Sequence, residues 1–226
     1  MANFTRDGYG QVEPNQLSAQ KTGQIYASLP LDPEVNVLQN GEFMFYDYAN
    51  GTVNAGKAAA TGVIATQGEP MLVFNEIKLY EPFWRSSYKD FAMIRKGENY
   101  VTSPQATAGY GDGSLNTGAT ISPAHTEYPY RMDGFAPRLL KTNVGDIYTT
   151  NMIKTGVEYA LGDVLVLVKN ATSKTLVLEK EDTSSGSTQV AVGSLKFMVV
   201  KAPSTTTGGS WTMPDGQPAV KLQRIV

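Results

Sequence analysis

Residues 163–180 read DVLVLVKNATSKTLVLEK, and this stretch decides the fold. Two runs of Val and Leu, at 163–169 and 174–180, flank the polar residues 170–173. Short apolar runs that are rich in β-branched residues and separated by a turn predict a β-hairpin. Because both runs are apolar on both faces, we expect this hairpin to lie between two layers of structure.

Similar signals occur throughout the rest of the chain. The aromatic run at 42–48 precedes Asn50-Gly51, a dipeptide that favours a tight hairpin turn, and residues 52–55 are the expected returning strand. Further strands are predicted over residues 71–74, 195–201 and 219–226.

Three other segments are less regular. Residues 88–95 are the one stretch with a helical spacing of apolar side chains, and they predict a short helix. Residues 97–136 are rich in Gly, Thr, Pro and aromatic residues, which indicates a long contact loop or several short strands. A shift in composition near residues 155–162 is the one candidate for an internal boundary.

The first 34 residues are polar, contain three prolines and have no continuous apolar stripe. This pattern is compatible with a frayed terminus or with an extended arm that lies on a partner subunit, and the spaced apolar side chains favour the arm. We therefore predict an arm over 1–34 and a β-rich domain over 35–226. The residues of the arm that we expect to contact a partner are Phe4, Tyr9, Val12, Leu17, Ile25 and Tyr26.

Taken together, these patterns predict an all-β fold. We expect an antiparallel β-sandwich or barrel-like domain with long loops, an extended N-terminal arm and at most one short helix.

Composition excludes several classes of function. The 226 residues carry a formal net charge of -2, with no Cys and one His. Nucleic-acid binding proteins usually present a basic face, so we expect no direct contact with nucleic acid. Thiolate metal sites and disulfides require Cys, so we expect neither of these. The sequence has no apolar run of membrane-spanning length and no apolar signal region at its start. We therefore expect a soluble protein, made in the cytoplasm, with no membrane partner.

The sequence contains no strong catalytic motif. The single histidine, His125, lies in SPAHTE, and the sequence contains no G-x-S-x-G nucleophile motif. Residues 109–113 are glycine-rich but follow no strand and lack the lysine of a phosphate-binding loop. Acids such as Asp47 and Glu76 are scattered, without a spacing that defines a catalytic pair. We expect no enzyme activity, no cofactor and no bound metal.

Four phrases carry a family resemblance: VNVLQNGEFMFYD at 35–47, MLVFNE at 71–76, GDIYTTN at 145–151 and WTMPDGQPAVKL at 211–222. In style and order they resemble head decoration (cement) proteins and related virion proteins of tailed bacteriophages. The resemblance implies a virion structural protein, made in the bacterial host cytoplasm, that binds the outside of an assembled head and braces it against internal pressure. Its implied partners are the major capsid protein and further copies of itself, as a dimer or trimer.

Aromatic residues support an alternative from another class. Trp84 and the tyrosines of the 97–136 region are able to stack on sugar rings, although aromatic side chains are equally typical of β cores and subunit interfaces. The alternative is a carbohydrate- or receptor-binding module of a phage tail or baseplate. A glycan-degrading enzyme that uses Glu76 or Asp47 is a more distant third possibility.

Overall fold

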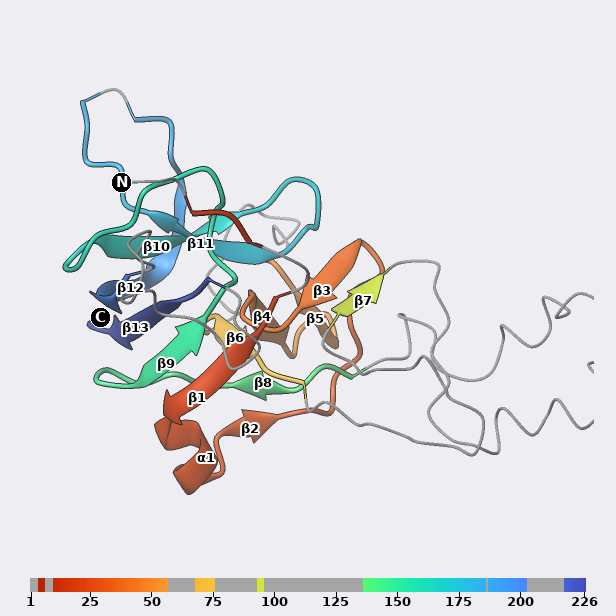
Figure 1. Cartoon of the computed structure of the whole chain (residues 1–226). Coiled ribbons are helices and arrows are strands. Elements are labelled where there is room, and N and C mark those ends of the chain that lie inside the picture. The colour runs from red at the N-terminus through yellow and green to blue at the C-terminus, as the bar shows by residue number, and fades with distance from the viewer. Residues whose placement is uncertain are drawn as a thin grey trace, which may run out of the picture.

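The computed structural model describes residues 4–6, 10–56, 68–75, 93–95, 136–185, 187–202 and 218–226, with backbone alone for 93–95. Within these residues the predicted all-β class is confirmed, because one five-residue helix accompanies thirteen strands (Figure 1). The elements are β1 (Val12–Gln16), α1 (Ser18–Thr22), β2 (Ile25–Tyr26), β3 (Val37–Gln39), β4 (Phe43–Asp47), β5 (Thr52–Asn54), β6 (Met71–Val73), β7 (Met93–Arg95), β8 (Leu139–Leu140), β9 (Ile147–Thr150), β10 (Val164–Lys169), β11 (Leu176–Lys180), β12 (Ala191–Lys201) and β13 (Val220–Arg224).

Eleven of these strands form one open antiparallel sheet. The order is β1-β9-β13-β12-β10-β11-β4-β6-β8-β2, and β5 pairs with β4 outside this path. The two end strands, β1 and β2, are consecutive in the chain and are joined by α1, so the sheet curls back toward itself (Figure 1). Strands β3 and β7 form a separate two-stranded sheet.

The predicted hairpin at 163–180 is present as β10 and β11. Five residue pairs join the two strands, from Leu165 opposite Lys180 to Lys169 opposite Leu176. In the turn, the Asn170 side chain accepts hydrogen bonds from the backbone N–H groups of Thr172 and Ser173. Strands β12 and β4 flank the hairpin, so it lies inside the sheet rather than at an edge.

Aromatic side chains fill the interior of the curled sheet. Phe197 of β12 contacts Phe43 of β4 at a ring-centroid distance of 5.3 Å, and it contacts Tyr148 of β9 edge-on at 5.9 Å. All three side chains are fully buried. Neither β4 nor β9 is a neighbour of β12 in the sheet. The three rings therefore meet across the interior of the curled sheet and pack its opposite sides against each other.

Residues 1–34 do not form a free arm in their described part, and the predicted boundary at residue 34 has no structural counterpart. Strand β1 pairs with β9, and β2 pairs with β8. Between them, Asp146 accepts hydrogen bonds from the Ser18 backbone N–H at 3.1 Å and from the Ser18 hydroxyl at 3.0 Å. The segment is therefore part of the main sheet. Its isolated apolar residues pack one by one against the core of the same chain.

The C-terminal strand is fixed in the same region. Arg224 on β13 is buried, and its guanidinium donates to the carbonyl oxygens of Thr142 and Val226. It also forms an ion pair with Glu69 at 2.8 Å. Because β1 and β13 pair with opposite edges of β9, the two ends of the described chain are locked into one structure.

Other predictions have mixed outcomes. The strands expected near 52–55, 71–74, 195–201 and 219–226 are present, with slightly different bounds. The helix predicted over 88–95 is wrong in its described part, since residues 93–95 pair with β3 as strand β7. Residues 155–162 connect two strands of the same sheet, so the structure shows no division there. Of the 97–136 region, residues 97–135 lie outside the described residues. No helix in the described ranges has the length and apolar character needed to cross a membrane.

Candidate functional site

The tip of the β4–β5 hairpin is organised around one buried carboxylate. Asp47 is 1% exposed, and its Oδ1 accepts hydrogen bonds from the backbone N–H groups of Ala49 at 3.0 Å and Asn50 at 3.1 Å. Its Oδ2 accepts from the side-chain amides of Asn50 at 2.6 Å and Asn54 at 3.0 Å. Gly51 adopts a φ of 65°, whereas Asn50 does not have a positive φ. The hairpin therefore closes through the four residues 48–51 instead of the two-residue Asn-Gly turn that the sequence predicts. The hairpin tip is therefore held in one conformation by four charge-assisted hydrogen bonds.

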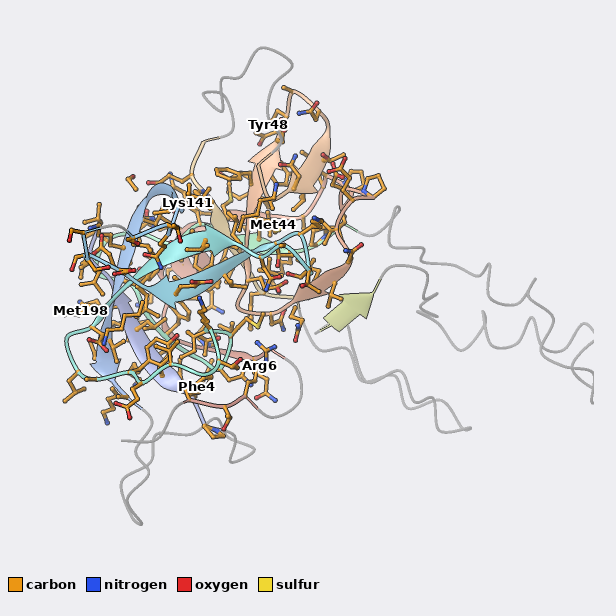
Figure 2. The ribbon with its side chains drawn as sticks, turned by 90° about the horizontal axis from the view of Figure 1, so that it is seen from above. Phe4, Arg6, Met44, Tyr48, Lys141 and Met198 are labelled. Carbon is orange, nitrogen blue, oxygen red and sulfur yellow. The ribbon has the colours of Figure 1, made fainter. Side chains whose placement is uncertain are left out.

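Three tyrosine rings run from the core to this tip. Tyr26 of β2 packs against Tyr46 of β4 at 5.2 Å, and Tyr46 packs against Tyr48 at 5.0 Å with an interplanar angle of 70°. Tyr46 is buried, and its hydroxyl is hydrogen-bonded to the hydroxyl of Ser28. Tyr48 is 73% exposed and lies at the hairpin tip, at the periphery of the fold (Figure 2). We call Tyr26, Tyr46 and Tyr48 the tyrosine row.

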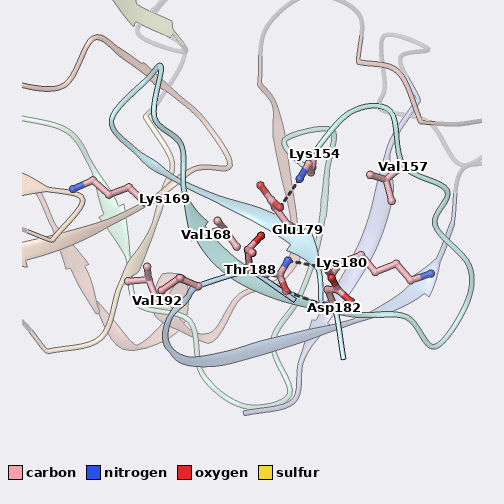
Figure 3. A pocket seen from close by; sticks show the side chains of 11 residues that line it. Lys154, Val157, Val168, Lys169, Glu179, Lys180, Asp182, Thr188 and Val192 are labelled. Atoms are coloured by element: carbon pink, nitrogen blue, oxygen red, sulfur yellow. Dashed lines mark hydrogen bonds and ion pairs between the residues drawn. The ribbon is translucent and has the colours of Figure 1, made fainter. Parts of the chain in front are cut away.

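A groove of about 650 Å³ lies on another part of the surface (Figure 3). Val157, Val168 and Val192 are among the side chains that line it, together with charged groups. Those charges are already paired within the chain, because Lys154 contacts Glu179 at 2.7 Å and Lys180 contacts Asp163 at 2.8 Å. The remaining charged groups on the groove lining are Lys169, which donates to the Gly56 carbonyl oxygen, and Asp182, which accepts hydrogen bonds from Ser184. The charged groups of the groove lining therefore already have partners within the chain, although Lys154 and Lys180 remain 51% and 42% exposed.

The six residues predicted as arm contacts are distributed over the fold rather than gathered at one surface. Phe4 and Leu17 are 3% exposed and belong to the core. Val12, Ile25 and Tyr26 are half-buried and pack against the core. Tyr9 lies outside the described residues. Of the six, Tyr26 is the one that the structure joins to an exposed aromatic surface, through the tyrosine row.

Phe4 shows how the N-terminal segment is attached. Its backbone N–H donates to the Val157 carbonyl at 2.8 Å, and its carbonyl accepts from the Gly156 N–H at 2.9 Å. Its ring contacts Tyr159 edge-on at 6.0 Å. These contacts are all within the chain, so Phe4 stabilises the fold and does not present a contact surface. Figure 2 places Phe4 and Arg6 away from Tyr48.

Among the described residues, the carboxyl group with the largest pKa shift lies beneath this N-terminal segment. Glu42 is fully buried; its Oε2 accepts a hydrogen bond from the Gln39 backbone N–H at 2.8 Å, whereas its Oε1 has no hydrogen-bond partner. Burial raises the pKa of Glu42 to about 8, against the opposing effects of the Gln39 amide, the Thr175 hydroxyl and the Arg6 charge. Glu42 has no exposed surface, so we interpret it as a structural rather than a ligand-binding group.

Residues proposed for chemistry fall into two groups. Asp47 holds the hairpin turn together, which gives it a structural role in place of the catalytic one considered from the sequence. Glu76, Trp84, His125 and the glycine-rich residues 109–113 lie outside the described residues. In the part of the chain that the structure describes, no three His, Asp or Glu side chains are grouped so that they could hold a metal ion.

Sequence reasoning missed the tyrosine row. The alternation in FMFYDYANG places Tyr46 and Tyr48 on the same side of an extended chain, which was a usable signal. The contribution of Tyr26 depends on a contact between segments 20 residues apart and has no local signature.

Comparisons with known proteins give no relatives. No family model matches the sequence, no curated protein matches it, and no solved structure matches the fold.

Proposed function

We propose that this chain is a virion structural protein that decorates the outside of an assembled phage head and stabilises it. The observation that carries the proposal is a β scaffold that displays an ordered aromatic side chain to solvent. Tyr48 is 73% exposed at the tip of the β4–β5 hairpin, and its ring packs on Tyr46, which is 3% exposed. An exposed aromatic anchor on a fixed framework is typical of a protein that works by binding another surface.

The phage assignment comes from the four resembling phrases, and each of them includes strand residues. Residues 35–47 include β3 and β4, residues 71–76 include β6, residues 145–151 include β9, and residues 211–222 include the start of β13. The proposed partners are the major capsid protein and other copies of this chain, as a dimer or trimer, on the capsid exterior. The proposed role involves binding and no catalysis.

Linkage explains how such binding would stabilise a shell. A ligand that binds only the assembled lattice stabilises it by about 2.7 kcal/mol per site at a hundredfold excess over Kd. An interface of roughly 1,600 Å² is sufficient for specific binding, and contact with several shell subunits at once adds avidity. A scaffold whose first and last strands both pair with β9 suits a protein held under load.

The test is sedimentation of the purified protein with mature shells that lack it. We expect the protein to pellet with the shells at micromolar concentration and to raise the temperature at which they release their contents. Protein that stays in the supernatant, with shells of unchanged stability, would contradict the proposal. Immature, unexpanded shells serve as the control for a state-specific surface.

The tyrosine row favours a second candidate, a carbohydrate- or receptor-binding module of a phage tail or baseplate. An exposed tyrosine ring supplies a face on which a sugar is able to stack. A glycan array with wild-type protein and a Tyr48→Ala variant tests it. Glycan binding that disappears in the variant would support this second function, and an empty array would remove it.

A further inference from the structure

The β4–β5 hairpin tip combines rigidity with exposure in a way that folding alone does not require. Strands β4 and β5 are paired at Phe45–Asn54, Tyr46–Val53 and Asp47–Thr52, directly before the turn. The Asp47 carboxylate then fixes the turn through two backbone N–H groups and two side-chain amides. Immediately after Asp47, the chain places Tyr48 with 73% of its surface in solvent.

The Tyr48 ring has little freedom despite its exposure. It packs edge-on against Tyr46, which is 3% exposed and is held in turn by Tyr26 and by the Ser28 hydroxyl. A side chain that is already ordered loses little conformational entropy when it binds. Pre-ordered aromatic side chains of this kind are frequent among the few residues that dominate the affinity of an interface.

The polar groups around the tip distinguish between a protein and a sugar as the occupant. Sugar binding needs hydrogen-bonding groups beside the stacking ring that are available to hydroxyls. Here both Asp47 oxygens and the side-chain NH2 groups of Asn50 and Asn54 are engaged with one another, so this network offers a sugar few groups besides the Asn50 Oδ1. The tip also lies at the periphery of the fold (Figure 2). A peripheral aromatic ring with most of its polar neighbours engaged fits a pocket on a protein.

We propose that Tyr48, presented by the β4–β5 hairpin tip, is the anchor that inserts into an apolar pocket of the shell subunit. This inference rests on the proposed decoration function and adds to it the surface that faces the shell. It also makes the orientation specific: the tyrosine row points toward the capsid, and the valine-lined groove does not take part in the anchoring contact.

The experiment measures sedimentation with mature shells over a concentration series for wild-type protein and three variants. Tyr48→Ala removes the ring, and Tyr48→Phe retains the ring without its hydroxyl. Leu161→Ser is the matched control, because Leu161 is 69% exposed and lies in the turn before β10 rather than in the tyrosine row. Thermal unfolding of each variant establishes that the fold is intact, and a glycan array is run in parallel.

We expect Tyr48→Ala to weaken shell binding by at least about 30-fold, which corresponds to roughly 2 kcal/mol. Tyr48→Phe and Leu161→Ser are expected to stay within about threefold of wild type. If wild type binds and Tyr48→Ala binds equally well, the anchor is wrong and the decoration function stands. The anchor would also be wrong if Tyr48→Ala and Leu161→Ser lost shell affinity to the same extent. It would be wrong as well if the protein bound glycans through Tyr48 but did not bind shells. If wild type fails to bind shells at all, the decoration function fails together with the anchor that rests on it.

Discussion

Glu42 makes the stability of this protein depend on pH in an unusual direction. The carboxyl group is fully buried, one of its oxygens has no hydrogen-bond partner, and burial raises its pKa from 4.5 to about 8. A carboxyl group with a raised pKa in the folded state stabilises the fold, relative to the unfolded chain, while it is protonated. Its contribution is therefore complete below pH 4.5 and is lost as the pH rises toward and through 8.

The size of the effect follows from the two pKa values. Each unit of difference is worth about 1.4 kcal/mol, so the 4.5-to-8 window corresponds to roughly 5 kcal/mol in total. Because titration is gradual at the ends of the window, we expect about 3 kcal/mol of it to be lost between pH 5 and pH 8. This is a large fraction of the stability of an ordinary domain.

The perturbation is Glu42→Gln, which keeps the shape of the side chain and an oxygen that is able to accept from the Gln39 backbone N–H, but has no charge to bury. Urea unfolding at pH 5, 6, 7 and 8 gives the free energy of unfolding of both proteins. We expect the variant to be within about 1 kcal/mol of wild type at pH 5 and about 3 kcal/mol more stable at pH 8. Glu34→Gln, which removes an exposed carboxylate, controls for the change in net charge.

The reasoning would be refuted if the difference between Glu42→Gln and wild type were the same at all four pH values. That result would mean that Glu42 is charged in the folded protein throughout, with its charge balanced by Arg6. An Arg6→Met variant separates the two cases, because loss of the Arg6 charge should steepen the pH dependence of a wild-type Glu42.

Three further substitutions test other features of the fold by the change in urea unfolding free energy. Leu17→Ala should cost about 2–5 kcal/mol because Leu17 is buried in the core, and a cost below about 1 kcal/mol would restore the idea of a free arm. Lys174→Gly should stabilise the folded protein by up to about 1 kcal/mol, because Lys174 has a φ of 61° that glycine adopts without strain. A loss of stability would show that the Lys174 side chain contributes more than the backbone strain costs. Gly41→Ala should prevent stable folding, since Gly41 has a φ of 94° and a Cβ there would lie 2.6 Å from both the Met152 Cβ and the Thr150 Oγ1. Normal stability of this variant would mean that the surrounding strands shift readily.

The parts of the fold that could be predicted from the sequence are those with local causes. The β10–β11 hairpin follows from two apolar runs around a turn residue, Asn170, that caps its own loop. The existence of the β4–β5 hairpin follows from Asn50-Gly51, because Gly51 tolerates the positive φ that ends the turn, although the turn has four residues rather than two. In both cases the residues that determine the structure lie within about 20 positions of one another.

The errors concern contacts between distant segments. Strand β1 includes Pro14 and has no alternating apolar pattern, and its partner β9 lies more than 130 residues away. Pairing of this kind leaves no periodic signal in either segment, so single buried residues such as Phe4 and Leu17 resemble the spaced anchors of an arm. A tolerated Pro is consistent with the position of β1 at an end of the sheet.

The candidate site was predictable in kind but not in place. The sequence pointed to Trp84 and the tyrosines of 97–136 as a candidate sugar-stacking surface, and these lie outside the described residues. The exposed ring at Tyr48 depends instead on ring contacts among Tyr26, Tyr46 and Tyr48. The turn network at Asp47 was likewise invisible, because a carboxylate that accepts four hydrogen bonds has the same sequence signature as a solvated one.

The most direct test of the proposed decoration function is a reconstruction by electron microscopy of the virion to which the proposal assigns this chain. The account predicts density for the β-fold in many symmetry-related copies on the outer face of the head, with the β4–β5 hairpin pointing into the shell. Density for the protein on the tail alone, or a head that carries no copy of it, would contradict the account.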